Sequence, residues 1–295
     1  MSLISKHITI FAMPKPFAGR IATIQRNAIG SWLQLQPRPQ VILFGNEAGV
    51  AEVANEFGVD YLRDVERNEF GTPLMHNMFS LARQHARYET MAYVNADIIL
   101  CRDFVSAISR VNQLGLENYL AIGRRVNMCI DARLDFSDPD WEQKVVQLAQ
   151  TTGSLAPRVC KDYFIFKKPL FANIPPFAIG RAVYDNWFVY HAHQQGLPVI
   201  DVTRSVYAIH QNHDYGHIKG GRGAAYVSGE ETKRNRQLAG GMRLLKGSSA
   251  SWKLTASGIK PTRFPPLAQF LLDSPRLSLL ALELLGLKRP RHTAS

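Results

Sequence analysis

The chain has 295 residues, of which 46% are hydrophobic and 20% are charged. This composition supports a sizeable buried core and excludes a chain that is disordered throughout. The formal net charge of +11 favours anionic partners such as nucleic acid, anionic lipid or phosphate-bearing small molecules. Between residues 246 and 295 there are eight basic and two acidic side chains, so much of the excess charge is C-terminal.

Cysteine usage and hydropathy indicate the compartment. Cys101, Cys129 and Cys160 are odd in number and far apart in sequence, so they form no disulfide framework. The N-terminus lacks the apolar core of a signal peptide, and no apolar stretch reaches about 18 residues. We therefore expect a cytoplasmic protein without a membrane-spanning helix.

Apolar runs alternate with helical periodicity along the chain. Strands are predicted over 7–13, 40–44, 59–62, 91–94, 119–122, 163–166, 199–202 and 206–209. Helices are predicted over 19–35, 47–57, 72–86, 104–113, 139–150 and 182–195, and the Gly-rich segment 216–223 is predicted to be a loop. Gly58 is expected to end the second helix. This alternation predicts an α/β fold whose mostly parallel sheet carries helices on both faces.

Two polar residues interrupt a long apolar run at the fourth strand. Asn95 and Asp97 are two positions apart, so on a strand they would point to the same side. A buried carboxylate is costly unless it is paired or bound to a cation, and hard divalent cations prefer oxygen ligands. This pattern indicates a metal site, and the alternative is a turn or cap at the end of the strand.

Two later segments also carry candidate chemistry. Asp185 falls in the first turn of a predicted helix, where an acid complements the helix dipole, and Trp187 beside it suits the core. His210 and His213 follow an apolar strand closely, beside an aspartate, and are candidate ligands. Zinc is a further alternative, although no cysteine accompanies them. Lys219 and Arg222 lie in a Gly-rich loop that suits phosphate.

Together these motifs resemble GT-A glycosyltransferases of the family 2-like group. Asn95-Ala96-Asp97 resembles the D-x-D element, with Asn in place of the first Asp, and Asn68, Gly71 and Asn77 resemble the N-x-G…N segment before it. The resemblance spans roughly residues 7–217 and implies a Rossmann-like GT-A fold. It implies a catalytic domain over 1–240, with a nucleotide-binding half (1–103) and an acceptor half (104–240), followed by a basic, Leu-rich tail over 241–295.

The resemblance implies a hexosyl- or pentosyltransferase that moves a sugar from a nucleotide-diphosphate donor to an acceptor hydroxyl, with inversion. Mg²⁺ or Mn²⁺ would be held by Asp97, His213 and His210, and Asp185 would be the catalytic base. Expected donor-binding residues are Pro14, Arg20, Asn46, Asn68, Gly71, Asn77, Asn95, Asp162, Lys219 and Arg222, beside the weaker candidates Lys15 and Glu47. Expected acceptor-binding residues are Arg124, Arg125 and Trp187.

Two other functions are alternatives to sugar transfer. A sugar nucleotidyltransferase normally has a G-x-G-x-R loop after the first strand, where this chain retains only Gly19-Arg20. A non-enzymatic nucleic-acid-binding protein would interleave basic and aromatic residues, which this chain does not. We therefore expect no nucleic-acid partner.

The C-terminal tail carries a short apolar helix. Residues 277–287 are Leu-rich and are followed by Lys288, Arg289 and Arg291. The run is too short to span a bilayer of roughly 30 Å, but it suits the interface of an anionic membrane. The alternative is packing on the catalytic domain or on a second subunit. Peripheral attachment at the inner face of the membrane would suit a glycan or lipid-linked acceptor and a role in surface polysaccharide or glycolipid synthesis.

Overall fold

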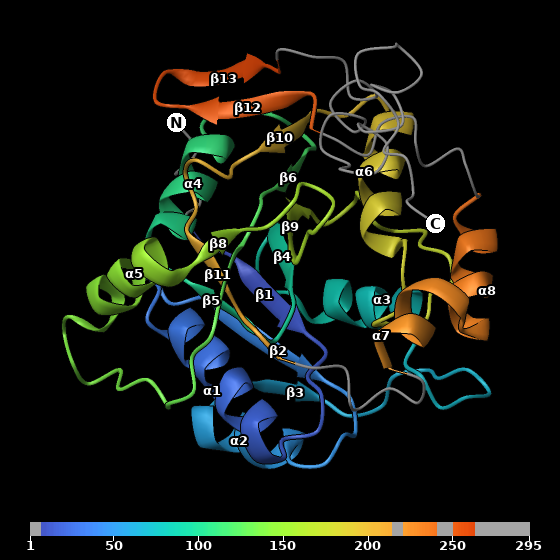
Figure 1. The fold of residues 1–295 in the computed structure, drawn as a ribbon. Coiled ribbons are helices and arrows are strands. Elements are labelled where there is room, and N and C mark those ends of the chain that lie inside the picture. Colours follow the sequence, from blue (N-terminus) through green and yellow to red (C-terminus); the bar gives the residue numbers. More distant parts are fainter. Residues whose placement is uncertain (1–6, 214–220, 241–249, 263–295) are drawn as a thin grey trace, which may run out of the picture.

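A nine-stranded sheet forms the centre of the fold. The computed structural model describes residues 7–213, 221–240 and 250–262. The strands run in the order β13-β12-β10-β6-β9-β4-β1-β2-β3 (Figure 1). Their bounds are β1 (Thr9–Ala12), β2 (Gln40–Phe44), β3 (Asp60–Leu62), β4 (Thr90–Val94), β6 (Leu120–Ile122), β9 (Tyr163–Lys167), β10 (Val199–Asp201), β12 (Trp252–Thr255) and β13 (Gly258–Pro261).

Most neighbours in this sheet are parallel. The exceptions are β9, which is antiparallel to both β4 and β6, and β13, which is antiparallel to β12. Because β9 runs the other way, its first residue, Tyr163, pairs with Val94 at the end of β4. Residues that precede β9 therefore lie at the same rim as residues that follow β4. The mostly parallel sheet predicted from the sequence is confirmed.

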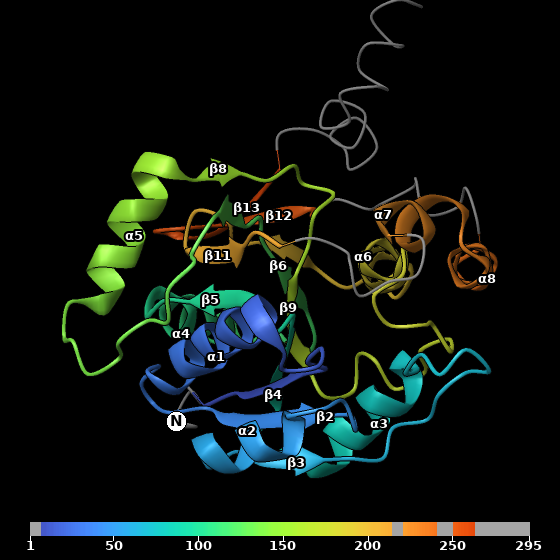
Figure 2. The same cartoon turned by 60° about the horizontal axis from the view of Figure 1, so that its bottom comes forward.

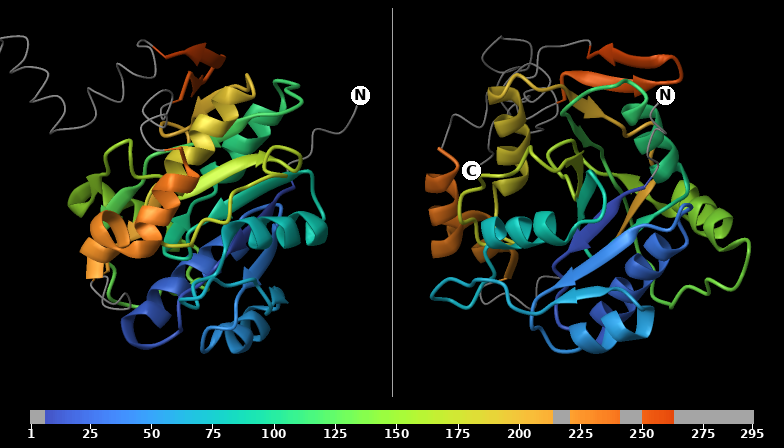
Figure 3. Two further views of the ribbon diagram at one scale, coloured as in Figure 1. Left: turned by 90° about the vertical axis from the view of Figure 1, so that its right-hand side faces the viewer. Right: turned by 180° about the vertical axis from the view of Figure 1, so that it is seen from behind.

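Helices cover both faces of the sheet, because successive side chains of a strand point to opposite sides. On β1, Ile10 packs into the cluster that includes α1, α2 and α4, whereas Phe11 packs into the cluster that includes α3 and α6. Figure 3 (left panel) shows the face under α3 and α6. The helices are α1 (Gly19–Leu33), α2 (Val50–Phe57), α3 (Met75–His85), α4 (Asp103–Asn112) and α6 (Tyr184–Gln194).

A second sheet lies between α1 and α5 (Trp141–Thr152), as Figure 2 shows. Its order is β5-β11-β7-β8, with β5 (Ile98–Leu100), β11 (Ala208–Gln211), β7 (Val126–Met128) and β8 (Ser154–Leu155). Ile99 and Ile209 pack against α5, and the Trp32 indole of α1 donates a hydrogen bond to the Ile98 carbonyl at 2.8 Å. Both faces of β5 are thus buried.

The apolar run at 93–100 is two strands joined by a turn, not one strand. β4 ends at Val94, residues 96–97 form the turn, and the Ile98 amide donates to the Asn95 carbonyl at 3.1 Å. The turn carries the chain from the large sheet to the second sheet. Asn95 and Asp97 therefore do not share a strand face, and the same-side argument from the sequence is wrong.

The C-terminal part adds elements that the sequence analysis did not assign. Within residues 216–223, the described positions 221–223 are helical, and α7 (Gly221–Gly223), the π-helical turn η1 (Ala224–Ser228) and α8 (Glu230–Leu238) follow one another. Hairpin β12–β13, placed in the tail by sequence, extends the large sheet beside β10. The Leu-rich segment 277–287 lies outside the described residues. Within the described part, no helix is long and apolar enough to cross a bilayer.

Candidate active site

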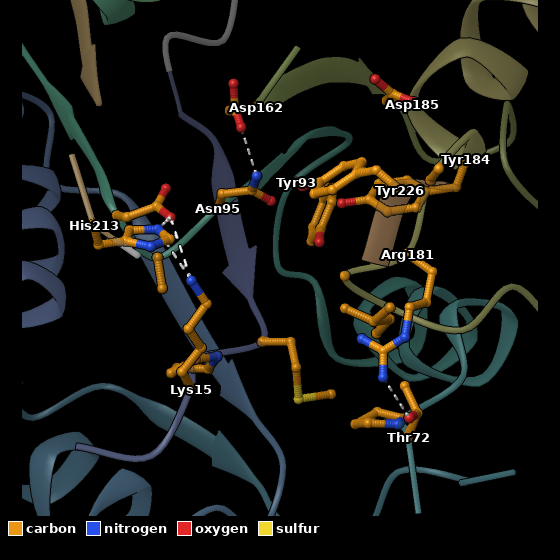
Figure 4. Close-up of a pocket in the computed structure, with 18 of the residues that line it drawn as sticks. Lys15, Thr72, Tyr93, Asn95, Asp162, Arg181, Tyr184, Asp185, His213 and Tyr226 are labelled. Atoms are coloured by element: carbon orange, nitrogen blue, oxygen red, sulfur yellow. Dashed lines mark hydrogen bonds and ion pairs between the residues drawn. The ribbon is translucent and has the colours of Figure 1, made fainter. Parts of the chain in front are cut away.

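A cavity of about 970 Å³ opens where several strands of the large sheet end. The loop after β1, the turn after β4, the segment before β9 and the start of α6 all contribute to its lining. Open parallel sheets bind ligands outside the carboxyl ends of their strands. Figure 4 shows His213 and Asp185 on opposite sides of this cavity, with Asn95 and Asp162 between them.

Asp97, His210 and His213 converge at one side of the cavity. Asp97 Oδ2 lies 2.9 Å from His213 Nε2 and 3.8 Å from His210 Nε2. One potential ligand atom from each residue lies within 4.8 Å of the others. Among the described residues, Asp97 Oδ1 and His210 Nδ1 are buried without a hydrogen-bond partner. A carboxylate and two imidazoles this close together, with an unsatisfied atom on Asp97 and another on His210, fit a divalent cation.

The protonation states of this cluster suit ligation. Burial opposes ionisation of Asp97, but His210, His213 and Lys15 outweigh burial and hold its pKa well below the usual value. Burial lowers the pKa of His210, although Asp97 acts in the opposite sense. Metal ligands must be an ionised carboxylate and a neutral imidazole. The surroundings of Asp97 and His210 therefore favour the ligand forms of these two side chains.

Antiparallel pairing of β5 and β11 assembles the cluster. His210 on β11 is the register partner of Ile98, the residue after Asp97. Gln211 donates two hydrogen bonds to the Asp97 backbone carbonyl, one from its backbone N–H at 3.2 Å and one from its side-chain Nε2 at 3.3 Å. The Gln211 side chain also donates to the Ile24 carbonyl and accepts from Asn27, both on α1. Gln211 therefore fixes the turn that carries Asp97.

Asn95 points to a different partner from Asp97. Its Nδ2 donates to Asp162 Oδ1 at 2.8 Å, and Asp162 forms an ion pair with Arg125. Asp162 is 7% exposed, so this pair is largely removed from water. The three side chains line the cavity, and Figure 4 shows Asn95 and Asp162 between His213 and Asp185.

Asp185 lies in the first turn of α6. The residue before the helix, Val183, has φ of 83°, a left-handed conformation that is a real strain for a β-branched residue. Helix α6 therefore begins at Tyr184 rather than at 182, where the sequence placed it. Burial raises the pKa of Asp185, and the nearby Lys161 opposes that rise. Lys161 Nζ also donates to Asn186 at 3.0 Å.

An aromatic wall and an arginine network, both missed by the sequence analysis, complete the cavity. Tyr93, Tyr184 and Tyr226 gather beside Asp185 (Figure 4). Arg181 forms an ion pair with Glu231 at 2.6 Å, and its guanidinium also donates to Thr72. Tyr93 is two residues before Asn95 and Tyr184 directly precedes Asp185, so the sequence offered a signal for both tyrosines. Arg181 and Tyr226 carried no comparable signal.

The N-x-G segment shapes a loop at the rim. Asn68 Oδ1 accepts the backbone amides of Phe70 and Thr72, and its Nδ2 donates to Glu231. Gly71 has φ of 78° and lines the cavity. Asn68 therefore builds the loop and does not itself reach the cavity lining.

Eleven of the residues selected from the sequence line the cavity: Pro14, Lys15, Glu47, Gly71, Asn95, Asp97, Arg125, Asp162, Asp185, His210 and His213. Others have partners elsewhere. Arg20 pairs with Asp131, Asn46 accepts from Arg67, Asn77 accepts from the Glu66 amide, and Arg124 donates to the Ala156 carbonyl. Lys219 and the side chain of Arg222 lie outside the described residues.

Trp187 needs a correction, because it does not line the cavity. It is 8% exposed and packs in the core between Phe177 and His191. Helix α6 turns its apolar side to the sheet, so the indole points away from the face that carries Asp185. Trp187 is therefore a core residue in the structure and not part of the cavity wall.

The role of Gln211 gives a test of stability. Gln211→Leu should lower the free energy of unfolding by about 1–3 kcal/mol, because buried partners on α1 and at Asp97 lose their hydrogen bonds. Urea denaturation measures this loss. Gln84→Leu, at an exposed position of α3, is the matched control and should change stability by less than about 0.5 kcal/mol. Equal midpoints for the two variants would contradict the assignment.

No protein-family model and no curated protein matches this chain. Among solved structures it is similar to residues 1–349 of S. aureus TarS in complex with UDP. That match has a TM-score of 0.50 and 10% identity, and it covers 82% of this chain and 66% of that one. Mannosyltransferase PcManGT from Pyrobaculum calidifontis, in complex with GDP-Man and Mn²⁺, matches with a TM-score of 0.43 and 13% identity, over 71% of this chain and 58% of that one. The chain spans less than two thirds of either protein.

The likeness to TarS establishes the fold. The chain has the GT-A, Rossmann-like architecture of nucleotide-diphospho-sugar glycosyltransferases, as the sequence motifs predicted.

Proposed function

We propose that this chain is a glycosyltransferase that moves a sugar from a nucleoside-diphosphate donor to an acceptor hydroxyl. The observation that carries the proposal is one cavity with the Asp97–His210–His213 cluster on one side and Asp185 on the other. A donor that spans the cavity would place its diphosphate at the first side and its sugar near the second. The similar TarS structure contains UDP, which supports a nucleotide in this cavity.

Asp97, His210 and His213 would hold Mg²⁺ or Mn²⁺, which stabilises the negative charge of a leaving diphosphate when it is bound. Pro14, Gly71 and Asn95 line the side of the cavity assigned to the donor. The tyrosines of the aromatic wall are placed to contact a sugar ring. Arg124 and Trp187 lie outside the cavity lining, so we do not assign them to the acceptor.

Asp185 is the proposed base. It would take the proton of the acceptor hydroxyl while that oxygen bonds to the anomeric carbon and the bond to the diphosphate breaks. Its raised pKa moves it toward the operating pH, which improves a general base.

The other carboxylates of the cavity favour a single displacement with inversion. Within the described part of the lining, Glu47 pairs with Arg67, Asp162 pairs with Arg125, and Asp97 belongs to the cluster. Among the carboxylates of the described lining, Asp185 is therefore the one for which no ion pair is observed. A retaining double displacement would need a second available nucleophile.

A melting-temperature screen of nucleoside diphosphates, with and without Mn²⁺, tests the function. A nucleotide that binds only the folded chain raises its melting temperature. We expect one nucleoside diphosphate to do so, more strongly with Mn²⁺. Incubating the matching sugar nucleotide with acceptors should then release nucleoside diphosphate. Release of pyrophosphate would instead identify a nucleotidyltransferase, and no binding of any nucleotide would contradict the proposal.

Asp185→Asn keeps the size of the side chain but removes the base. We expect transfer to fall by about 10²- to 10⁴-fold, while the nucleotide-induced rise in melting temperature is retained. Asp135→Asn, at an exposed position remote from the cavity, is the matched control. Transfer by Asp185→Asn at the rate of the control would exclude Asp185 as the base.

Lys161 tunes this base and gives a pH prediction. Its positive charge favours the ionised form of Asp185, so Lys161→Met should raise the pKa of Asp185 further. The base would then stay protonated to higher pH, and the acid limb of kcat/KM against pH would move upward. Lys161→Arg keeps the charge and should leave the limb in place. A limb that is unmoved in Lys161→Met would show that Lys161 does not act on the base.

A further inference from the structure

The Lys15 ammonium lies inside the Asp97 cluster. Its Nζ is 3.1 Å from His213 Nε2 and 3.9 Å from Asp97 Oδ2 (Figure 4). The Lys15 side chain is 28% exposed, so its charge is partly removed from water. These two atoms, which lie 2.9 Å apart, also belong to the candidate metal site.

The backbone holds Lys15 firmly in this place. Lys15 lies between Pro14 and Pro16 in the loop after β1. Its amide donates to Gln25 Oε1 at 2.6 Å, and its carbonyl accepts from Gln25 Nε2 at 2.8 Å. Gln25 is 2% exposed on α1, so this two-bond clamp is well shielded. The stem of Lys15 therefore starts from a fixed point beside the cluster.

Among the residues that the structure describes, the charges around the cluster balance when Lys15 is included. Asp97 supplies the carboxylate, because the other position of the motif is the neutral Asn95. The neighbouring Asp162 is already neutralised by Arg125. One ammonium beside one carboxylate satisfies the cluster electrostatically, whereas a divalent cation arriving there meets a positive charge a few ångströms away.

The contacts of His213 Nε2 also show that the Lys15 ammonium and a metal ion would need the same position. His213 Nε2 contacts both Asp97 Oδ2, at 2.9 Å, and Lys15 Nζ, at 3.1 Å. A protonated Nε2 donates to Asp97 but repels the ammonium, and an unprotonated Nε2 accepts from Lys15 but faces the carboxylate with a lone pair. A metal needs the same lone pair. Lys15 and a metal therefore require the same atoms.

We propose that the Lys15 ammonium is a built-in counter-ion of the Asp97–His210–His213 cluster, and that a divalent cation binds there only by displacing it. The proposal deepens the proposed function, since it concerns metal loading at the same site. It makes Lys15 a residue that sets metal affinity, and the metal-free chain already has a charge-balanced cluster.

The test is titration of the full chain with Mn²⁺ alone, with free Mn²⁺ followed by electron paramagnetic resonance. Lys15→Met removes the competing cation, and we expect its Kd for Mn²⁺ to fall about tenfold or more. Lys15→Arg keeps a cation and should bind as weakly as the wild type. Lys253→Met, at an exposed position of β12, is the matched control and should not change the Kd. Adding Asp97→Asn to Lys15→Met should abolish the tight binding and thereby locate it.

Two results would overturn the proposal. One is a Kd for Lys15→Met that equals or exceeds that of the wild type while its melting curve shows a folded chain. The other is the absence of Mn²⁺ binding in all the variants, which would remove the metal from the proposed function as well. Nucleotide binding is measured separately, so a donor site without a metal, or a metal site without a donor, would be recognised as such.

Discussion

The site depends on stabilising one buried carboxylate, that of Asp97. Its side chain is 13% exposed, and an ionised carboxylate at such depth is costly unless cations or donors surround it. His210, His213 and Lys15 supply that surrounding from two distant parts of the chain. The antiparallel pairing of β5 with β11 brings the histidines there, so the geometry of the cluster depends on the second sheet.

The same electrostatic logic divides the carboxylates of the cavity into separate roles. Arg125 forms an ion pair with Asp162, and Arg67 forms one with Glu47. Asp185 has no such partner in the described part of the chain, and burial raises its pKa, so it is suited to exchange a proton. Two carboxylates of one cavity thereby acquire opposite properties, because the pKa of Asp97 is held well below its usual value and that of Asp185 is raised.

Much of this arrangement could be predicted from the sequence, and the failures have physical causes. The period of the apolar residues located most strands and helices, and the rule that ligands bind at strand ends pointed to Asp97 and the histidines. The turn at 95–97 was treated as strand because apolar residues continue on both sides of it, across a change of sheet. Trp187 was ambiguous because a tryptophan beside a polar helix start suits either a ligand or the core. The pairing of Asp162 with Arg125 depends on the reversed direction of β9, which periodicity does not reveal.

The reversed strand also explains why the first position of the motif is Asn95 rather than an aspartate. Because β9 is antiparallel to β4, Asp162 is placed directly against that position, with its Oδ1 2.8 Å from Asn95 Nδ2. A carboxylate at 95 would face a second carboxylate at this distance, whereas the amide donates a hydrogen bond to it. The asparagine therefore follows from the presence of Asp162 and Arg125. It also leaves the cluster with a single carboxylate, and that deficit in negative charge is what allows one lysine to balance it.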